Sequence, residues 1–120
     1  IRIPAPDAAL AFFGEELGMR LLSRQVLQHD GFTLYFLAFT DEEPPNPDID
    51  AVSNREWLWQ RSYTTLELQH RHDDSVPLDS TDAGFRGIEI VGGTGARPRR
   101  WLIRPSAAGS TWKRVRARDG

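Results

Sequence analysis

The carboxylate and imidazole groups around residue 67 are the side chains whose types and spacing could do chemistry. Residues 63–70 alternate between apolar and polar, which places Leu66 and Leu68 on one face of a β-strand and Glu67 on the other. A carboxylate in the middle of a strand faces either water or a site that needs its charge. Periodicity alone leaves both interpretations of Glu67 open.

Two histidines close the same segment. His70 and His72 are two residues apart, so they share a strand face and could bind a metal ion, but they lie on the face opposite Glu67. The alternative is a solvated entry into a loop. Glu89, in a later strand, could replace a metal ligand after a shift of one register step. The glycine-rich residues 92–95 lack the Lys-Ser/Thr pair of a phosphate-binding loop, so they are a weak signal.

The elements that must position these side chains follow from periodicity and turn residues. Asp7 is expected to be the N-cap of a helix that Gly18 ends. Residues 32–39 are aromatic and aliphatic throughout and are expected to form a strand buried on both faces. The expected order is strand 1–3, helix 8–16, strand 19–26, turn 29–31, strand 32–39, loop 40–54, a strand or helical turn at 56–60, strand 63–70 and strand 84–91.

Composition excludes several kinds of site. The chain has 120 residues, which is enough for a single domain with one core, and it contains no cysteine. Disulfides, thiolate metal sites and cysteine nucleophiles are therefore excluded. No apolar run reaches the roughly 18 residues of a membrane span, and no signal-peptide pattern is present, so we expect a cytoplasmic protein without a membrane partner.

Charge divides the chain into two parts. Residues 1–85 carry a net charge of −9, whereas residues 86–120 carry +7. After Val91 the sequence is rich in Arg, Gly, Pro, Ala and Ser without lasting periodicity, and we expect residues 92–120 to be a basic tail without regular structure. A shifted reading frame or a misjoined exon would produce such a change. Binding to nucleic acid is the less favoured interpretation, because the tail contains no recognisable module.

Several stretches up to residue 91 resemble glyoxalase I, and they occur in the order and near the spacing of that family. The resemblance rests on residues 6–13 with 17–19, on 31–38, on 65–70, and on 84–90, which is a damaged version of the family's GFGHIGI strand. It implies an α+β fold of the vicinal-oxygen-chelate type, built from βαβββ modules. Residues 1–91 would then be a complete first module with the first strand of an incomplete second module.

The resemblance also implies an activity. Family members are lactoylglutathione lyases, which convert the hemithioacetal of methylglyoxal and glutathione into S-lactoylglutathione at a zinc or nickel ion. By position, Glu67 matches a metal-ligand glutamate, Arg2 matches an arginine that holds a glutathione carboxylate, and Phe32 matches a residue that lines the pocket. The resemblance further implies glutathione as co-substrate and a possible homodimer.

The chain departs from the family at the other ligand positions. Gly87 stands where the family has a histidine ligand, no counterpart of the last ligand glutamate follows Val91, and the first ligand would precede Ile1. A lone carboxylate does not hold a catalytic zinc, which typically has three protein ligands. The sequence therefore leaves two hypotheses, a lactoylglutathione lyase or a truncated, catalytically inactive relative of that enzyme.

Overall fold

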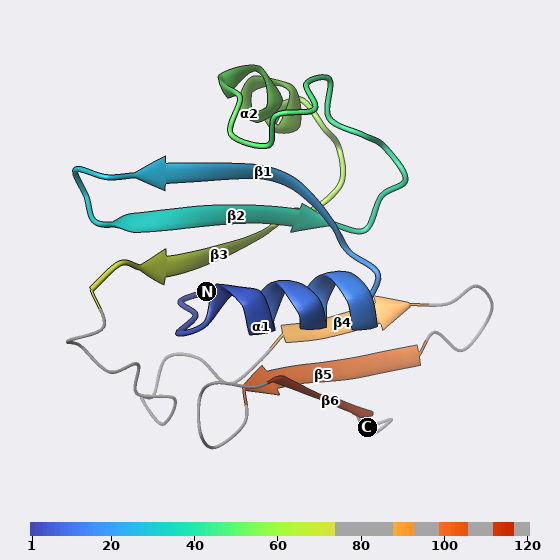
Figure 1. The fold of residues 1–120 in the computed structure, drawn as a ribbon. Helices are drawn as coiled ribbons and strands as arrows, with labels where there is room; N and C mark the ends of the chain where they lie inside the picture. The colour runs from blue at the N-terminus through green and yellow to red at the C-terminus, as the bar shows by residue number, and fades with distance from the viewer. Residues whose placement is uncertain (74–87, 93–98, 106–111, 117–120) are drawn as a thin grey trace. The chain divides into compact units, whose positions relative to one another are not determined.

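The computed structural model describes residues 1–73, 88–92, 99–105 and 112–116. The chain divides into two compact units, Ile1–Pro77 and Leu78–Gly120, and each is described by itself. Figure 1 shows the elements of both units, coloured along the chain. The expected boundary at residue 91 would place strand β4, Ile88–Gly92, in the first domain, whereas contacts place it in the second unit.

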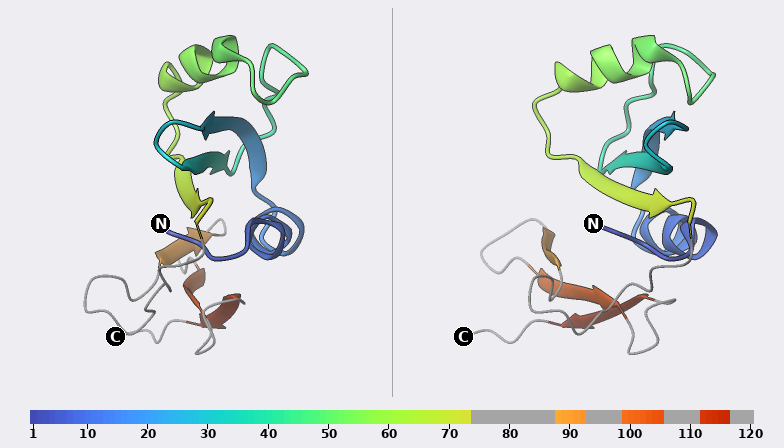
Figure 2. Two further views of the ribbon diagram at one scale, coloured as in Figure 1. Left: turned by 60° about the vertical axis from the view of Figure 1, so that its left-hand side comes forward. Right: turned by 90° about the vertical axis from the view of Figure 1, so that its left-hand side faces the viewer.

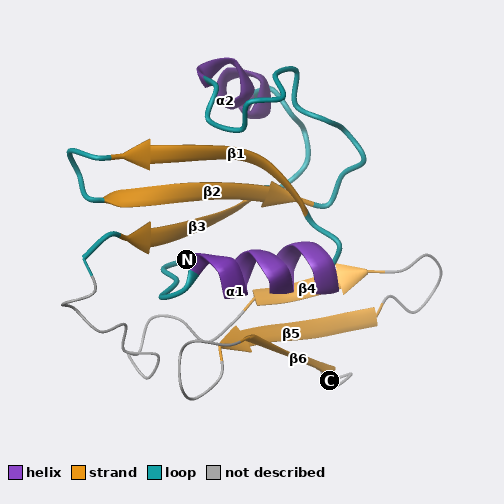
Figure 3. Ribbon diagram, in the orientation of Figure 1, coloured by secondary structure: helices purple, strands orange, loops and turns teal. Residues whose placement is uncertain are grey.

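The first unit is a three-stranded antiparallel sheet with three helical segments (Figure 3). Its strands lie side by side in the order β1-β2-β3. The expected strand at residues 1–3 is reduced to a single parallel bridge between Arg2 and Gln69 of β3. In chain order the elements are α1 (Pro6–Leu10), the π-helical η1 (Ala11–Glu16), β1 (Arg20–Leu27), β2 (Phe32–Ala38), α2 (Val52–Trp59) and β3 (Leu66–Arg71).

The first helical segment begins two residues earlier than expected. Its N-cap is Ala5, with Pro6 in the first turn, so the prediction of Asp7 as N-cap was wrong. Proline is favoured at this position because a backbone N–H there has no partner within the helix, so its absence in proline costs nothing, and because the fixed φ of proline suits a helix. Gly18 ends the segment as expected, at φ +83°, and the Met19 amide donates to the Phe13 carbonyl at 2.9 Å.

Strand β2 is buried on one face rather than on both, which corrects the sequence-based expectation. Burial alternates over residues 32–37, with Thr33, Tyr35 and Leu37 buried and Phe32 half-buried, while Ala38 at the end of the strand is buried as well. Burial raises the pKa of Tyr35, and the charge of Asp7 in α1 adds to this effect. One face covered along the strand and one face covered only at the Ala38 end give this alternation in an antiparallel sheet.

A small core joins β1, β2 and α2. Leu22, Ala38 and Leu58 are buried together, and Phe36, Trp57 and Tyr63 pack against them. At residues 56–60, where a strand or a helical turn was expected, the structure has helix α2, which begins inside the expected loop. Figure 2 shows α2 beyond the β1 edge of the sheet in two further views.

The segment before α2 is held by Asn54, which is fully buried. Its Nδ2 donates to the carbonyls of Asn46 and Asp48, both at 2.9 Å, and its Oδ1 accepts from the Asn46 amide at 2.9 Å. The acidic, proline-rich segment is thus fixed to the helix that follows it. A buried amide with all these partners satisfied makes the segment part of the fold.

The second unit contains an antiparallel sheet in the order β4-β5-β6, formed by Ile88–Gly92, Arg99–Pro105 and Trp112–Arg116. β5 and β6 lie in the segment that was expected to lack regular structure, so that expectation fails for these residues. The apolar residues Trp101 and Ile103 pair in register with Ile90 and Ile88 of β4. The expected strand residues 84–87, with Gly87, lie outside the described residues.

Candidate functional site

One face of the first sheet carries the sequence-predicted Glu67 and Arg2 together. Phe36 lies directly opposite Glu67 in the β2–β3 register, and Arg2 is bridged to Gln69. Paired residues of neighbouring strands point to the same side of a sheet, and residues two apart share a face. We call this side the Glu67 face and define it by the following residues: Arg2, Phe32, Leu34, Phe36, Glu67 and Gln69.

Glu67 is exposed, as a carboxylate that faces water or a ligand must be. Its carboxylate has no hydrogen bond or ion pair with any residue in the described part of the chain. Its main-chain carbonyl accepts a hydrogen bond from the N-terminal amine of Ile1 at 2.9 Å. The strand that carries Glu67 is therefore fixed by the N-terminal residues, while the side chain is left available.

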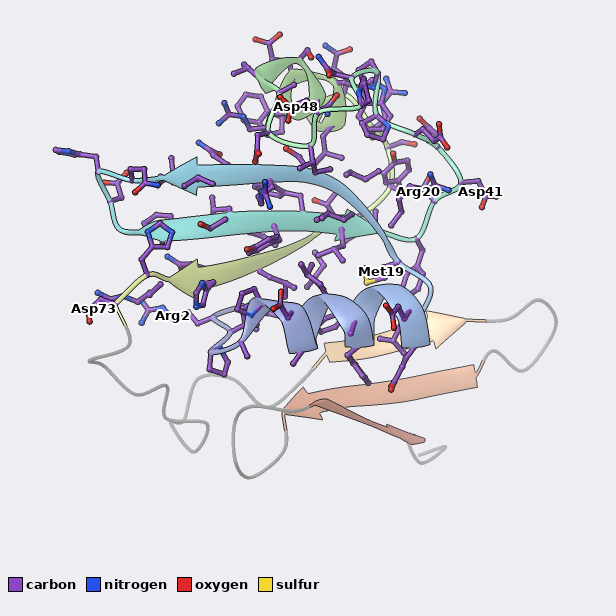
Figure 4. The ribbon with its side chains drawn as sticks, viewed as in Figure 1. Arg2, Met19, Arg20, Asp41, Asp48 and Asp73 are labelled. Atoms are coloured by element: carbon purple, nitrogen blue, oxygen red, sulfur yellow. The ribbon has the colours of Figure 1, made fainter. Side chains whose placement is uncertain are left out.

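Arg2 is exposed at the β3 edge of the sheet (Figure 4). Phe32 is half-buried and pairs with Arg71, at the opposite end of the strand from the pair of Phe36 and Glu67. At about 3.3 Å per residue, four residues separate these two pairs by about 13 Å. The structure therefore brings Arg2 and Glu67 near each other and leaves Phe32 farther along the same face.

Sequence reasoning missed Phe36, and it did not name Gln69 as a site residue. Phe36 is the aromatic residue opposite Glu67, and Gln69 adds an amide two residues from the carboxylate. Alternation in β3 did place Gln69 on the face of Glu67, but the register that selects Phe36 rather than Phe32 is set by the hairpin and is not visible in either strand alone.

The histidines lie on the other face, as the parity of their positions predicted. His70 pairs with Thr33, a buried residue of the face opposite Glu67. His72 follows the strand, and its Nε2 lies 2.7 Å from the Thr33 Oγ1. His70 cannot bind the same ion as Glu67, because the two side chains point to opposite sides of the sheet. Glu89, the other proposed substitute, lies opposite Leu102 in the second unit.

The donor set of the Glu67 face does not by itself fit the metal of the resembled family. In the part of the chain that the structure describes, no three His, Cys, Asp or Glu side chains are grouped closely enough to hold an ion. Glu67 is the carboxylate of this face, and Gln69 offers a neutral oxygen. A catalytic zinc typically has three protein ligands, so these residues would be part of a site at most.

Perturbed pKa values occur at Tyr35 of β2 and at the ion pair of Arg24 and Asp50. Burial raises the pKa of Tyr35. A hydrogen-bonded ion pair with Arg24, with Nε–Oδ1 and Nη2–Oδ2 distances of 2.8 and 2.7 Å, lowers the pKa of Asp50. These residues fix the loop before α2 to β1, because the Arg24 amide also donates to the Ile49 carbonyl at 3.0 Å. They belong to the scaffold of the Glu67 face.

Sequence comparison finds glyoxalase I among curated proteins. The chain is 41% identical over 71 residues to the lactoylglutathione lyase of Pseudomonas aeruginosa, covering 58% of this chain and 38% of that protein. It is 36% identical over 70 residues to the glyoxalase I of Saccharomyces cerevisiae, covering 58% of this chain and 20% of that protein. The chain is a partial match to glyoxalase I. The matches span much less than half the length of these relatives, and no protein-family model matches the chain.

Structural comparison also finds a glyoxalase I. The trypanothione-dependent glyoxalase I of Leishmania major superposes with a TM-score of 0.53 at 17% identity, covering 95% of this chain and 79% of that one. The expected α+β fold of the vicinal-oxygen-chelate type is thereby confirmed. In the described residues, no helix is long and apolar enough to cross a membrane.

Proposed function

We propose that the Glu67 face binds the substrate of a lactoylglutathione lyase reaction, the isomerisation of the methylglyoxal–glutathione hemithioacetal to S-lactoylglutathione. The observation that carries the proposal is the placement of Glu67, an exposed mid-strand carboxylate beside Arg2 on the open face of the sheet. The partial glyoxalase I match supports it.

Each residue has a proposed role that its chemistry allows. The Arg2 guanidinium would bind a carboxylate of glutathione, because a planar pair of N–H donors matches a carboxylate. Phe32, Leu34 and Phe36 would contact the apolar parts of the conjugate. Glu67 would contribute one carboxylate oxygen toward the zinc or nickel ion that family members use.

The described residues do not complete the ligand set of a catalytic zinc ion. The proposal includes a homodimer and a cytoplasmic location, which follow from the resemblance and the sequence pattern respectively. Light scattering on the purified chain would test the dimer, because the mass of a monomer at all concentrations contradicts it.

Formation of S-lactoylglutathione tests the proposal. The purified chain is mixed with the hemithioacetal, first without metal and then with zinc or nickel. Any turnover should fall at least tenfold in Glu67→Gln and stay unchanged in the matched variant Glu56→Gln, an exposed glutamate of α2. Equal turnover in the two variants would contradict the role of Glu67.

The second candidate function is binding without turnover, by a catalytically inactive relative. The observation that favours it is the separation of possible ligands, with Glu67 on one face and His70 on the other. This alternative gives no product with any metal, yet it retains binding of S-lactoylglutathione that Arg2→Ala weakens. Product formation above the uncatalysed rate would exclude it.

A further inference from the structure

All three histidines of the chain lie toward one end of the first sheet. His29 lies in the turn between β1 and β2, while His70 and His72 lie at the end of β3. The His72 amide donates to the Gly31 carbonyl at 2.8 Å, which fixes the main chain of His72 to that turn. Phe32 of the Glu67 face lies at this same end, where it pairs with Arg71, but it points to the opposite side of the sheet from His70.

The ring of His72 is fixed as well as its main chain. Its Nε2 lies 2.7 Å from the Oγ1 of Thr33, a residue only 6% exposed. In the neutral tautomer that carries its proton on Nε2, the ring donates to Thr33 and presents the Nδ1 lone pair. Metal-binding histidines are commonly oriented by such a hydrogen bond from the second ring nitrogen.

His70 lies within reach of the same point. The ring centroids of His70 and His72 are 6.4 Å apart, with the rings inclined at 59°. A metal–nitrogen bond of about 2.0–2.1 Å places an ion about 3.2 Å from each ring centroid, so that tetrahedral binding needs centroids about 5.2 Å apart. His70 is half-buried and would have to move its ring by about 1 Å while His72 stays in place.

We propose that His70 and His72 form a binding site for a divalent transition-metal ion of the class that prefers imidazole nitrogen, zinc, nickel or copper. Water molecules complete the coordination, and Thr33 positions His72 without contacting the ion. The site lies on the face opposite Glu67, since His70 pairs with Thr33 while Glu67 pairs with Phe36. It is therefore separate from the proposed substrate-binding face and does not depend on the proposed reaction.

Titration of the tag-free, full-length chain with zinc chloride, followed by calorimetry, tests the site. We expect His70→Gln and His72→Gln each to abolish the zinc-binding heat assigned to this site. Thr33→Val, which keeps the shape of a buried side chain but removes the hydroxyl, should weaken binding by at least tenfold. His29→Gln is the matched control from the neighbouring turn and should bind zinc like the unmodified chain.

Amide chemical shifts locate the ion independently of the variants. Zinc should shift the resonances of residues 70–72 and Thr33, and circular dichroism of each variant shows whether it is folded. Zinc binding that persists in folded His70→Gln, shifts centred on Glu67 alone, or no zinc binding by the unmodified chain would each overturn the proposal. Turnover of the hemithioacetal should depend on Glu67 and not on His70, so failure of one proposal leaves the other intact.

Discussion

Phe36 and Glu67 lie directly opposite each other on neighbouring strands, and Phe36 also packs against the cluster of Leu22, Ala38 and Leu58. The phenyl ring thereby joins the core under α2 to the carboxylate on the open face. A change at Phe36 should affect both stability and ligand binding.

Phe36→Ala should destabilise the fold by about 2 kcal/mol, less than the loss at a fully buried phenylalanine because the ring is half-buried. It should also weaken binding of S-lactoylglutathione. Urea denaturation and calorimetric titration measure the two effects. Phe36→Leu is the control, since it should recover most of the stability; full binding by folded Phe36→Ala would exclude the ring from the ligand-binding surface.

Gly18 and Gly14 should respond in opposite directions to the same substitution. Gly18 has a φ of +83°, where an alanine side chain is strained, so Gly18→Ala should cost about 1 kcal/mol. At Gly14, inside η1, an added Cβ would meet nothing closer than the Met19 carbonyl oxygen at 3.7 Å. Gly14→Ala should therefore stabilise by about 0.5–1 kcal/mol. Thermal unfolding distinguishes the two, and equal shifts in melting temperature would contradict this explanation.

Asn54→Ala should destabilise the first unit by about 2–3 kcal/mol, because it removes three hydrogen bonds made by a fully buried amide. Ser53→Ala, at the exposed neighbouring position of α2, is the control and should have little effect. Denaturant unfolding measures the difference, and hydrogen exchange should show faster exchange at the Asn46 amide in the Asn54 variant. Equal stability of the two variants would show that Asn54 does not hold the loop.

The ion pair of Arg24 and Asp50 should give stability that depends on pH. Its hydrogen bonds lower the pKa of Asp50, so its contribution is full above the unfolded-state pKa of about 4 and is lost as the pH falls through the lower folded-state pKa. Both side chains are about 40% exposed, so the contribution at neutral pH should stay below about 1 kcal/mol.

Unfolding free energies between pH 2 and pH 7 measure this contribution, with Asp50→Asn as the test variant. The difference from the unmodified chain should vanish at the acidic end. Glu43→Gln is the control, because Glu43 is 79% exposed and lies 3.4 Å from Arg20. A difference for Asp50→Asn that is constant over the whole range would contradict the electrostatic origin.

The sequence predicted the strands of the first sheet better than the elements around them. Alternation placed Glu67 and Leu68 on opposite faces, and their exposure agrees, because side-chain period is a local property of a strand. The helix at Val52–Trp59 was predicted only as one of two alternatives over residues 56–60, because its start depends on the buried side chain of Asn54 and its position on packing of Leu58. β5 and β6 were missed because their arginine-rich sequences acquire strand pairing only from partners in register.

The candidate site was predictable in part for the same reason. Glu67 and Arg2 were identified from the resemblance, and the separation of His70 from Glu67 followed from parity alone. Phe36 could not be selected over Phe32, because both lie in the same strand and only the register with β3 distinguishes them.

We propose that the Glu67 face is the side of the sheet that binds a glutathione conjugate, whether or not the chain turns it over. Amide and side-chain chemical shifts of the purified chain, measured as S-lactoylglutathione is added, test this most directly. We expect the largest changes at Arg2, Phe36, Glu67 and Gln69 and none at Thr33 or His70. Changes confined to Thr33 and His70, or no changes at saturating conjugate, would contradict the claim.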